Sequence, residues 1–209
     1  MLTSVQCLTH PLVQEKVGRL RDRKTSTADF RRLVYELSLL LTVFCTEDLH
    51  TSSSSVETPI TTTTVQFVAD NIVLAPVLRA GLGMVDGMLQ LLPDAKVGHI
   101  GFYRDEQTLL PVEYYVNLPS VEQSVVFVLD PMLATGGTAT AALSLLKSRG
   151  VSKLRLVSLI AAPEGIRKVQ EDHPDVAIFT AAIDEGLNET GYIVPGLGDA
   201  GDRIFGTHQ

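Results

Sequence analysis

Four consecutive residues, Thr135 to Thr138, have the composition of a phosphate-binding loop. Gly136 and Gly137 lack a Cβ atom, so their N–H groups can approach an oxygen-rich group closely, and the two threonines add hydroxyl donors. The residues that follow, 139–148, predict a helix with Gly150 just beyond its end. The N–H groups and the dipole at the start of that helix point toward the loop. The pattern therefore predicts an anion site, and phosphate is the anion that fits it.

Asp130 opens the same loop, directly after the apolar run 125–129. That run is rich in β-branched residues and predicts a buried strand. A carboxylate at the carboxyl end of such a strand can accept hydrogen bonds from sugar hydroxyls, so a ribose beside the phosphate is implied. The loop lacks the lysine of a P-loop, which excludes a Walker-type ATPase. An ordinary strand-to-helix turn is the alternative reading of the loop alone.

Two arginines are the candidates for holding a polyanionic ligand. Arg79 ends an apolar run and is followed by small residues, so its guanidinium can reach across a sheet edge. Arg104 precedes a long irregular stretch that we expect to form an extended arm or flap over the site. Surface ion pairs are the alternative role for both, Arg104 with Asp105 or Glu106. The net charge of −7 argues against nucleic-acid and membrane surfaces, so positive charge must be gathered locally.

The C-terminal segment contains a literal GxGxxG at Gly196, Gly198 and Gly201. Only eight residues follow Gly201, so we expect no helix, second strand or ribose-binding acid after it, and we reject a dinucleotide-binding fold. These glycines instead indicate a tight turn of the backbone.

The elements that must position these residues alternate along the chain. Helical periodicity at 12–23 and at 28–44, the latter with Thr27 as N-cap, predicts an N-terminal helical part. The serine- and threonine-rich stretch 51–64 predicts a surface hairpin or mobile loop. We then expect strands at 72–78, 97–103, 125–129, 154–161 and 176–180, with helices at 82–92, 138–148 and 164–172. This alternation predicts an α/β fold with a parallel sheet in one domain spanning 1–209.

The cysteines, histidines and apolar stretches argue against a disulfide-rich, zinc-binding, secreted or membrane-spanning protein. Cys7 and Cys45 are too few for a disulfide framework, and the five histidines lack metal-ligand spacing. The N-terminus lacks the order of a signal peptide, and the longest apolar stretch, at 37–44, is too short to span a bilayer. We expect a cytoplasmic protein with reduced cysteines and no built-in metal cage.

Several strings resemble the type I phosphoribosyltransferases, in the form found in the uracil phosphoribosyltransferase branch. DPMLATGGT at 130–138 is similar to their loop for phosphoribosyl pyrophosphate (PRPP). PVLRAGLGMVDG at 76–87, GFYRDE at 101–106 and GYIVPGLGDAGDRIFGT at 191–207 also match, as do HPLV at 10–13 and APEGI at 162–166. The similarity runs nearly from end to end, with the motifs in order. Many relatives begin the PRPP loop with two acids, whereas Pro131 follows Asp130 here, a substitution that the uracil branch tolerates.

The resemblance implies a fold and a set of site residues. The fold has a central, mainly parallel sheet flanked by helices, with an N-terminal helical part, a β-arm and a C-terminal hood at about 182–209. Arg104, Asp130 and Asp199 are the implied catalytic residues, with Arg104 acting on the leaving group. Ile193, Gly198, Asp199 and Ala200 are the implied uracil-binding residues, in a hood whose main-chain groups face the flat base. Uracil offers two carbonyl acceptors and an N–H donor, which such backbone groups can read without a specialised side chain. The implied PRPP-binding residues are Arg79, Arg104, Asp130, Pro131, Met132, Leu133, Ala134, Thr135, Gly136, Gly137, Thr138 and Asp199.

The resemblance further implies transfer of the phosphoribosyl group of PRPP to uracil, giving UMP and diphosphate in pyrimidine salvage. Mg²⁺ is the implied cofactor, held mainly by PRPP and water. A homodimer or larger homo-oligomer and activation by GTP are implied by analogy only. Two alternatives stay open: a PRPP- or nucleotide-binding regulator with the same fold, and a phosphoribosyltransferase for another base.

Overall fold

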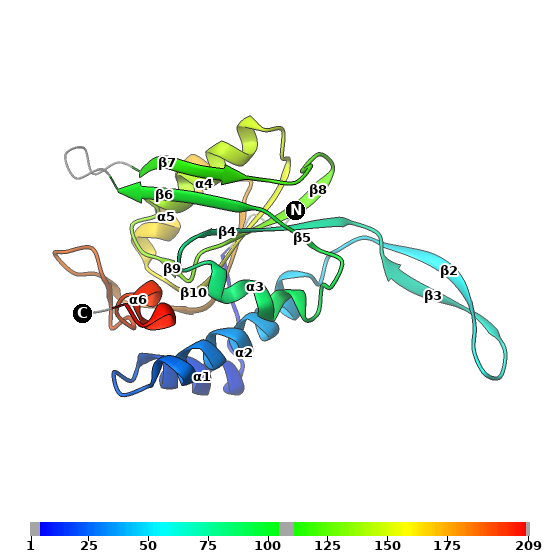
Figure 1. Ribbon diagram of the computed structural model, residues 1–209, viewed down its shortest axis with the longest axis horizontal. Helices are drawn as coiled ribbons and strands as arrows, with labels where there is room; N and C mark the ends of the chain where they lie inside the picture. The colour runs from blue at the N-terminus through cyan, green and yellow to red at the C-terminus, as the bar shows by residue number, and fades with distance from the viewer. Residues whose placement is uncertain (1–4, 105–110, 208–209) are drawn as a thin grey trace.

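A computed structural model describes residues 5–104 and 111–207, with the side chains of Arg104 and Pro111 left outside the description. Within these residues the chain forms a nine-stranded sheet with the main order β1-β11-β10-β8-β4-β6-β7 (Figure 1). In this spatial order, each strand from β1 through β11, β10, β8 and β4 to β6 is parallel to its neighbour, and β7 is antiparallel to β6. β5 also pairs with β4, and β9 pairs with β10. The predicted α/β class with a mainly parallel sheet is confirmed.

The strands of this sheet range from two to nine residues. They are β1 (Val5–Cys7), β4 (Asn71–Leu78), β5 (Lys96–Val97), β6 (His99–Arg104), β7 (Pro111–Asn117), β8 (Ser124–Leu129), β9 (Met132–Leu133), β10 (Lys153–Ala161) and β11 (Ala177–Ile183). All six residues of β8 are buried, because helices cover the sheet on both faces. Phe127 packs into the cluster on one face, and its neighbours Val126 and Val128 pack into the cluster on the other.

Helices α1 (Pro11–Arg21), α2 (Thr27–Cys45) and α3 (Leu82–Leu89) cover one face of the sheet, and α4 (Gly137–Ser148) and α5 (Pro163–Asp172) cover the other (Figure 1). The first core contains Phe30 and Leu37 against Phe179, and the second contains Leu143 and Val169 against Leu156. Apolar residues at helical spacing drive this packing, at about 25 cal/mol per Å² of buried apolar surface.

Two predicted element boundaries are wrong in an instructive way. The N-cap of α2 is Ser26, whose hydroxyl accepts the N–H of Asp29 at 3.1 Å, whereas Thr27 is already helical. The stretch predicted as one strand at 97–103 is divided at Gly98 into β5 and β6, although both strands pair with β4 in the same register and Gly98 N–H donates to Leu74 C=O. The other predicted strands and helices are present with shifts of a few residues.

The serine- and threonine-rich segment forms a hairpin, which is one of the two structures predicted for it. β2 (Thr51–Glu57) pairs antiparallel with β3 (Thr62–Val68) in an unbroken register. The hairpin extends well away from the rest of the molecule (Figure 1). Only Val56 and Val65 among its strand residues are partly shielded from solvent. Most of its side chains are polar and can remain exposed to water, but the hairpin has few contacts with the rest of the described chain.

The segment expected to form an extended arm after residue 104 contains β7, which pairs with β6. The connection between these strands, residues 105–110, lies outside the described residues. No helix among the described residues is both long and apolar enough to cross a membrane.

Candidate functional site

The residues proposed to bind PRPP gather at the carboxyl edge of two neighbouring strands. β4 and β8 are parallel, with Pro76 opposite Leu129. Arg79 therefore follows the end of β4 at the same edge where Asp130 follows the end of β8. In an open α/β sheet, this edge is where ligands bind. Gly81 is also required here, because a Cβ at that position would overlap the Leu129 carbonyl.

The loop after β8 is more ordered than the sequence indicates. Met132 and Leu133 form β9 and pair with β10, and Pro131 C=O accepts the N–H groups of Leu159 and Ile160. The loop is thereby fixed to the sheet along half its length. The predicted irregular run from 130 to 138 is wrong at these residues because β10 extends far enough to offer them a partner.

The two glycines of the loop have different structural roles. Gly136 caps α4 with φ of +82°, and a Cβ there would come within 2.9 Å of Gly165 C=O. Gly137 is the first residue of α4, not a loop residue, and a Cβ there would meet nothing nearer than Thr135 Oγ1 at 3.8 Å. The space beside Gly137 lies at the helix N-terminus, where free N–H groups and the helix dipole favour an anion.

Asp130 is a carboxyl group with an unusual proton affinity. Burial raises its pKa from 3.8 to about 6, and the hydrogen bond from Met132 N–H to Oδ1, at 3.3 Å, opposes that rise. The carboxyl is thus ionised at neutral pH at a cost in free energy. A carboxylate held in this way is a strong acceptor for hydroxyl groups of a ligand.

Arg79 contacts the C-terminal helix α6 (Ala200–Phe205). Its Nη2 lies 3.3 Å from Asp202 Oδ1, and its guanidinium carbon lies 5.9 Å from the centre of the Phe205 ring. The side chain is 57% exposed, so these contacts leave more than half of it accessible. The peptide bond between Leu78 and Arg79 is cis.

Helix α6 corrects the expectation that no helix fits near the C-terminus. Asp199 is its N-cap, and Asp199 Oδ1 accepts the N–H of Asp202 at 2.9 Å. A six-residue helix fits because this cap and the left-handed Gly206, with φ of +68°, close both ends within a few residues. The rejection of a dinucleotide fold still holds. Gly196 and Gly198 precede this short helix and Gly201 lies within it, and all three follow an antiparallel strand pair, β12 (Gly186–Leu187) and β13 (Ile193–Val194).

The hood lies against the loop 130–138 and the end of β4. A Cβ on Gly191 would lie 3.8 Å from Thr135, and one on Gly201 would lie 3.9 Å from Arg79 Nη2. Among the proposed uracil-binding residues, Ile193 and Ala200 are buried, whereas Gly198 is exposed with φ of +79°. The structure thus brings the C-terminal hood, the loop 130–138 and Arg79 to one edge of the sheet.

Arg104 is the proposed site residue that this geometry leaves out. Its backbone ends β6, and its side chain lies outside the described residues. β6 pairs with β4, with Gly101 opposite Leu78, so the strand that carries Arg104 runs alongside the one that leads to Arg79.

Sequence reasoning missed the side chains that hold the hood in place: Arg21, Asp184, Asp202 and Arg203. Asp184 follows β11 just as Asp130 follows β8, so the rule that located Asp130 could also have located Asp184. Arg21 and Arg203 carry no comparable local signal, because the partners that tie them to the other end of the chain, Asp184 for Arg21 and Leu20 for Arg203, lie more than 160 residues away in sequence.

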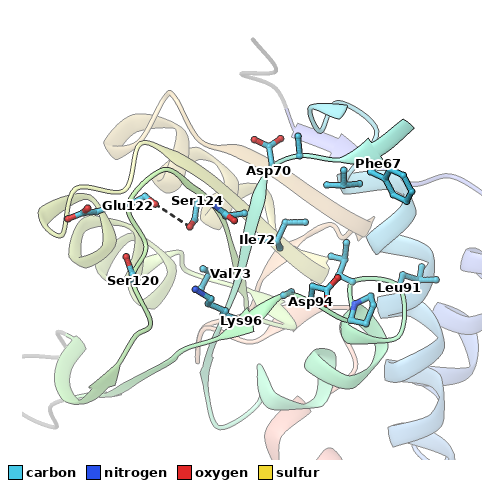
Figure 2. Close-up of a pocket in the computed structure, with 16 residues that line it drawn as sticks. Phe67, Asp70, Ile72, Val73, Leu91, Asp94, Lys96, Ser120, Glu122 and Ser124 are labelled. Atoms are coloured by element: carbon cyan, nitrogen blue, oxygen red, sulfur yellow. Dashed lines mark hydrogen bonds between the residues drawn. The ribbon is translucent and has the colours of Figure 1, made fainter. Parts of the chain in front are cut away.

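A cavity of about 520 Å³ lies at the opposite edge of the sheet, near the amino ends of β4 and β8 (Figure 2). Phe67, Ile72 and Leu91 line it together with Lys96 and three acidic residues, Asp70, Asp94 and Glu122. It shares no residue with the proposed PRPP or uracil sites. The surplus of carboxylates is unfavourable for a polyphosphate.

Comparison with known proteins identifies the family. The family model described as uracil phosphoribosyltransferase matches residues 7–207. A uracil phosphoribosyltransferase from Desulfitobacterium hafniense is 56% identical over 208 residues, covering 99% of this chain and 100% of the relative. One from Streptococcus suis is 55% identical over 204 residues, covering 97% and 98%.

Solved structures give the same picture at the level of the fold. The AQ2163 protein from Aquifex aeolicus superposes with a TM-score of 0.92 at 40% identity, covering 97% of this chain and 98% of that one. A hypoxanthine phosphoribosyltransferase from Staphylococcus aureus has a TM-score of 0.53 at 14% identity over 86% of this chain and 84% of its own. At that identity the likeness shows the fold alone.

Proposed function

The chain belongs to the uracil phosphoribosyltransferase family, and we infer from this that it transfers the phosphoribosyl group of PRPP to uracil, giving UMP and diphosphate in pyrimidine salvage. The observation that carries the inference is the meeting of Arg79, Asp130, the N-terminus of α4 and the α6 hood at one edge of the sheet. A phosphorylated sugar and a flat base need these groups side by side.

The reaction joins N1 of uracil to the anomeric carbon of PRPP as the bond from that carbon to the diphosphate oxygen breaks. The N1 proton leaves, and the electron pair of the broken bond departs with diphosphate. Such a displacement passes through an oxocarbenium-like centre, so the protein must align the reactants, stabilise charge and exclude water. It needs no covalent nucleophile.

We assign the PRPP-binding role to Arg79, Arg104, Asp199 and the whole loop 130–138. The first turn of α4 would hold the 5′-phosphate, because its N–H groups have no partner within the helix. Asp130 would accept the ribose hydroxyls, and Arg79 would meet the diphosphate. The exposure of Arg79 and the raised pKa of Asp130 support these roles.

We assign the uracil-binding role to the backbone of Ile193, Gly198 and Ala200, with Asp199 near the ribose and N1. One oxygen of Asp199 is engaged as the cap of α6, which fixes the direction of its carboxylate. A fixed carboxylate beside N1 is suited to receive the proton that N1 loses. Arg104 would act on the leaving diphosphate, where negative charge accumulates.

Mg²⁺ is our proposed cofactor. The described residues contain no group of three or more histidine, cysteine or acidic side chains that would enclose a metal ion. Mg²⁺ does not require such a cage, because it keeps several waters and is often bound through one or two carboxylates plus substrate phosphates. Asp130 is the carboxylate that the loop would contribute. When bound with PRPP, the ion would neutralise charge on the diphosphate.

We propose that the chain is one domain, with residues from about 182 to 209 as its hood, and that it acts in the cytoplasm as a homo-oligomer. The β2–β3 hairpin supports the oligomer, because an isolated two-stranded hairpin is marginally stable in water. Ile60, Phe67 and Val68 on it are 94%, 51% and 53% exposed. A second copy of the chain would cover them. A monomer by light scattering at micromolar concentration would contradict this.

Activation by GTP is part of the same proposal and is tested by turnover at subsaturating substrate with and without GTP. The function itself is tested by incubating the protein with PRPP, Mg²⁺ and a panel of bases and identifying the nucleotide formed. UMP from uracil is the expected product. PRPP binding without turnover of any base would favour a regulator, and preference for a purine would favour a different transferase.

A further inference from the structure

Arg21 and Asp184 form an ion pair between the end of α1 and the residue after β11. Arg21 Nη1 donates to Asp184 Oδ2 at 2.7 Å, and Arg21 Nη2 donates to Asp184 Oδ1 at 2.5 Å. The Asp184 side chain is only 3% exposed. Because the pair is bidentate, it fixes the orientation of both groups as well as their separation.

The same two side chains hold the backbone of Gly196 in the hood. Arg21 Nη1 donates to Gly196 C=O at 2.8 Å, and Gly196 N–H donates to Asp184 Oδ2 at 2.9 Å. Both polar backbone groups of this buried residue are therefore satisfied by the ion pair. Gly196 has φ of +62°, and a Cβ there would overlap the Ile193 carbonyl. The pair thus fixes a residue that packs directly on Ile193.

Arg203 holds the next residue of the hood from the other side. Its Nη1 donates to Leu197 C=O at 2.8 Å and to Leu20 C=O at 2.5 Å, and its Nη2 donates to Asp22 C=O at 2.7 Å. The turn at the end of α1 is therefore joined to two consecutive hood residues, 196 and 197. These lie between Ile193 and Gly198, two of the proposed uracil contacts.

We propose that the Arg21–Asp184 pair is a positioning device for the backbone that reads the base, and that it sets uracil affinity and base selectivity. The proposal rests on the function proposed above. Backbone groups cannot adjust by changing rotamer, so their alignment with a base depends on where the chain is held. Neither residue is placed at the reacting atoms, so we expect the chemical step and PRPP binding to be largely preserved without the pair.

Two conservative variants test the proposal. Asp184→Asn keeps the shape of the side chain and removes its charge, and Arg21→Lys keeps the charge and removes the bidentate fork. In each, we expect KM for uracil to rise about tenfold or more and selectivity for uracil over cytosine to fall. KM for PRPP should change less than about twofold and kcat less than about threefold. The rise in KM for uracil should be smaller for Arg21→Lys than for Asp184→Asn.

Lys16→Met is the matched control. Lys16 lies on the same helix and pairs with Glu36 on α2 at 2.6 Å, with side chains 25% and 27% exposed, away from the hood. This variant should lower the melting temperature slightly and leave KM for uracil unchanged. A comparable rise in KM for uracil in the control would mean that any loosening of α1 has the same effect.

Other results would overturn the proposal. Unchanged KM for uracil in a folded Asp184→Asn or Arg21→Lys protein would show that the pair does not position the hood. Equal rises in KM for uracil and PRPP, or failure of both variants to fold, would reduce the pair to a structural role. Wild-type protein that forms no UMP would instead refute the proposed function, which separates the two failures.

Discussion

The carboxylate of Asp130 should cost the protein stability at neutral pH, and Asp130→Asn removes that cost. Burial raises the pKa of this carboxyl from 3.8 to about 6. A difference of about two units, at about 1.36 kcal/mol per unit, corresponds to roughly 3 kcal/mol. The asparagine Oδ1 can still accept the Met132 N–H bond, so the variant changes the charge with little change in shape.

The sign of the effect follows from which state holds the proton more tightly. Below about pH 4 the carboxyl is protonated in both the folded and the unfolded chain, so the charge has no effect. As pH rises from about 4 to about 6, the unfolded chain loses its proton first, and the stability of the wild type falls. Above about pH 6 the full cost is present. The asparagine amide does not ionise in this pH range, so the Asp130→Asn variant does not lose this stability as the pH rises.

Thermal unfolding at pH 4 and pH 7.5 measures the effect directly. At pH 7.5 we expect Asp130→Asn to be more stable by up to roughly 3 kcal/mol, which is about 6–12 °C for a chain of this size at about 2–4 °C per kcal/mol. The advantage should shrink at pH 4. PRPP affinity should fall in the same variant, because an amide is a weaker acceptor for ribose hydroxyls than a carboxylate.

Asp175→Asn is the control for this prediction. The hydrogen bond from Lys147 lowers the pKa of Asp175, so neutralising that residue should give no gain in stability at pH 7.5. A melting temperature of Asp130→Asn at or below that of the wild type at pH 7.5, or a difference independent of pH, would refute the reasoning about burial.

Substitutions at two further residues, Gly137 and Arg104, test the assigned roles, each with a comparison variant. Gly137→Val should fold, because the space beside Gly137 is open, but calorimetry should show weakened PRPP binding, whereas Gly18→Val, also with open space around it, should bind normally. Unchanged PRPP affinity in folded Gly137→Val would contradict the proposal that the 5′-phosphate binds at the first turn of α4. Arg104→Ala should lower kcat tenfold or more, since a charge-assisted contact made in the transition state is worth up to ~3 kcal/mol, and Arg104→Lys should recover only part of it. Near-normal turnover of Arg104→Ala would exclude Arg104 from the mechanism.

Local patterns predicted the sheet and the position of Asp130 well for physical reasons. The buried strand β8 is a continuous apolar run, and Asp130 ends it at the edge where parallel strands present ligands. Helix α2 follows an apolar periodicity strong enough to place it within about a turn. The family motifs then assigned roles that no spacing rule could supply.

The missed features depend on partners that are distant in sequence. The strand β9 exists because β10 lies beside it, which nothing in residues 130–138 reveals. The difference between Gly136 and Gly137 arises from the approach of Gly165, and the short α6 arises from caps at both ends. The Arg21–Asp184 pair joins segments 163 residues apart, so only the folded chain brings it to the hood.

The most direct test of the account compares kcat/KM for uracil, 5-fluorouracil and cytosine with PRPP and Mg²⁺. If hood backbone groups pair with both carbonyls and the N3–H of uracil, cytosine presents two mismatches, each costing about 1–3 kcal/mol. We therefore predict a preference for uracil over cytosine of about a hundredfold or more, with 5-fluorouracil accepted because its hydrogen-bonding edge is the same. Similar values for uracil and cytosine would contradict the account.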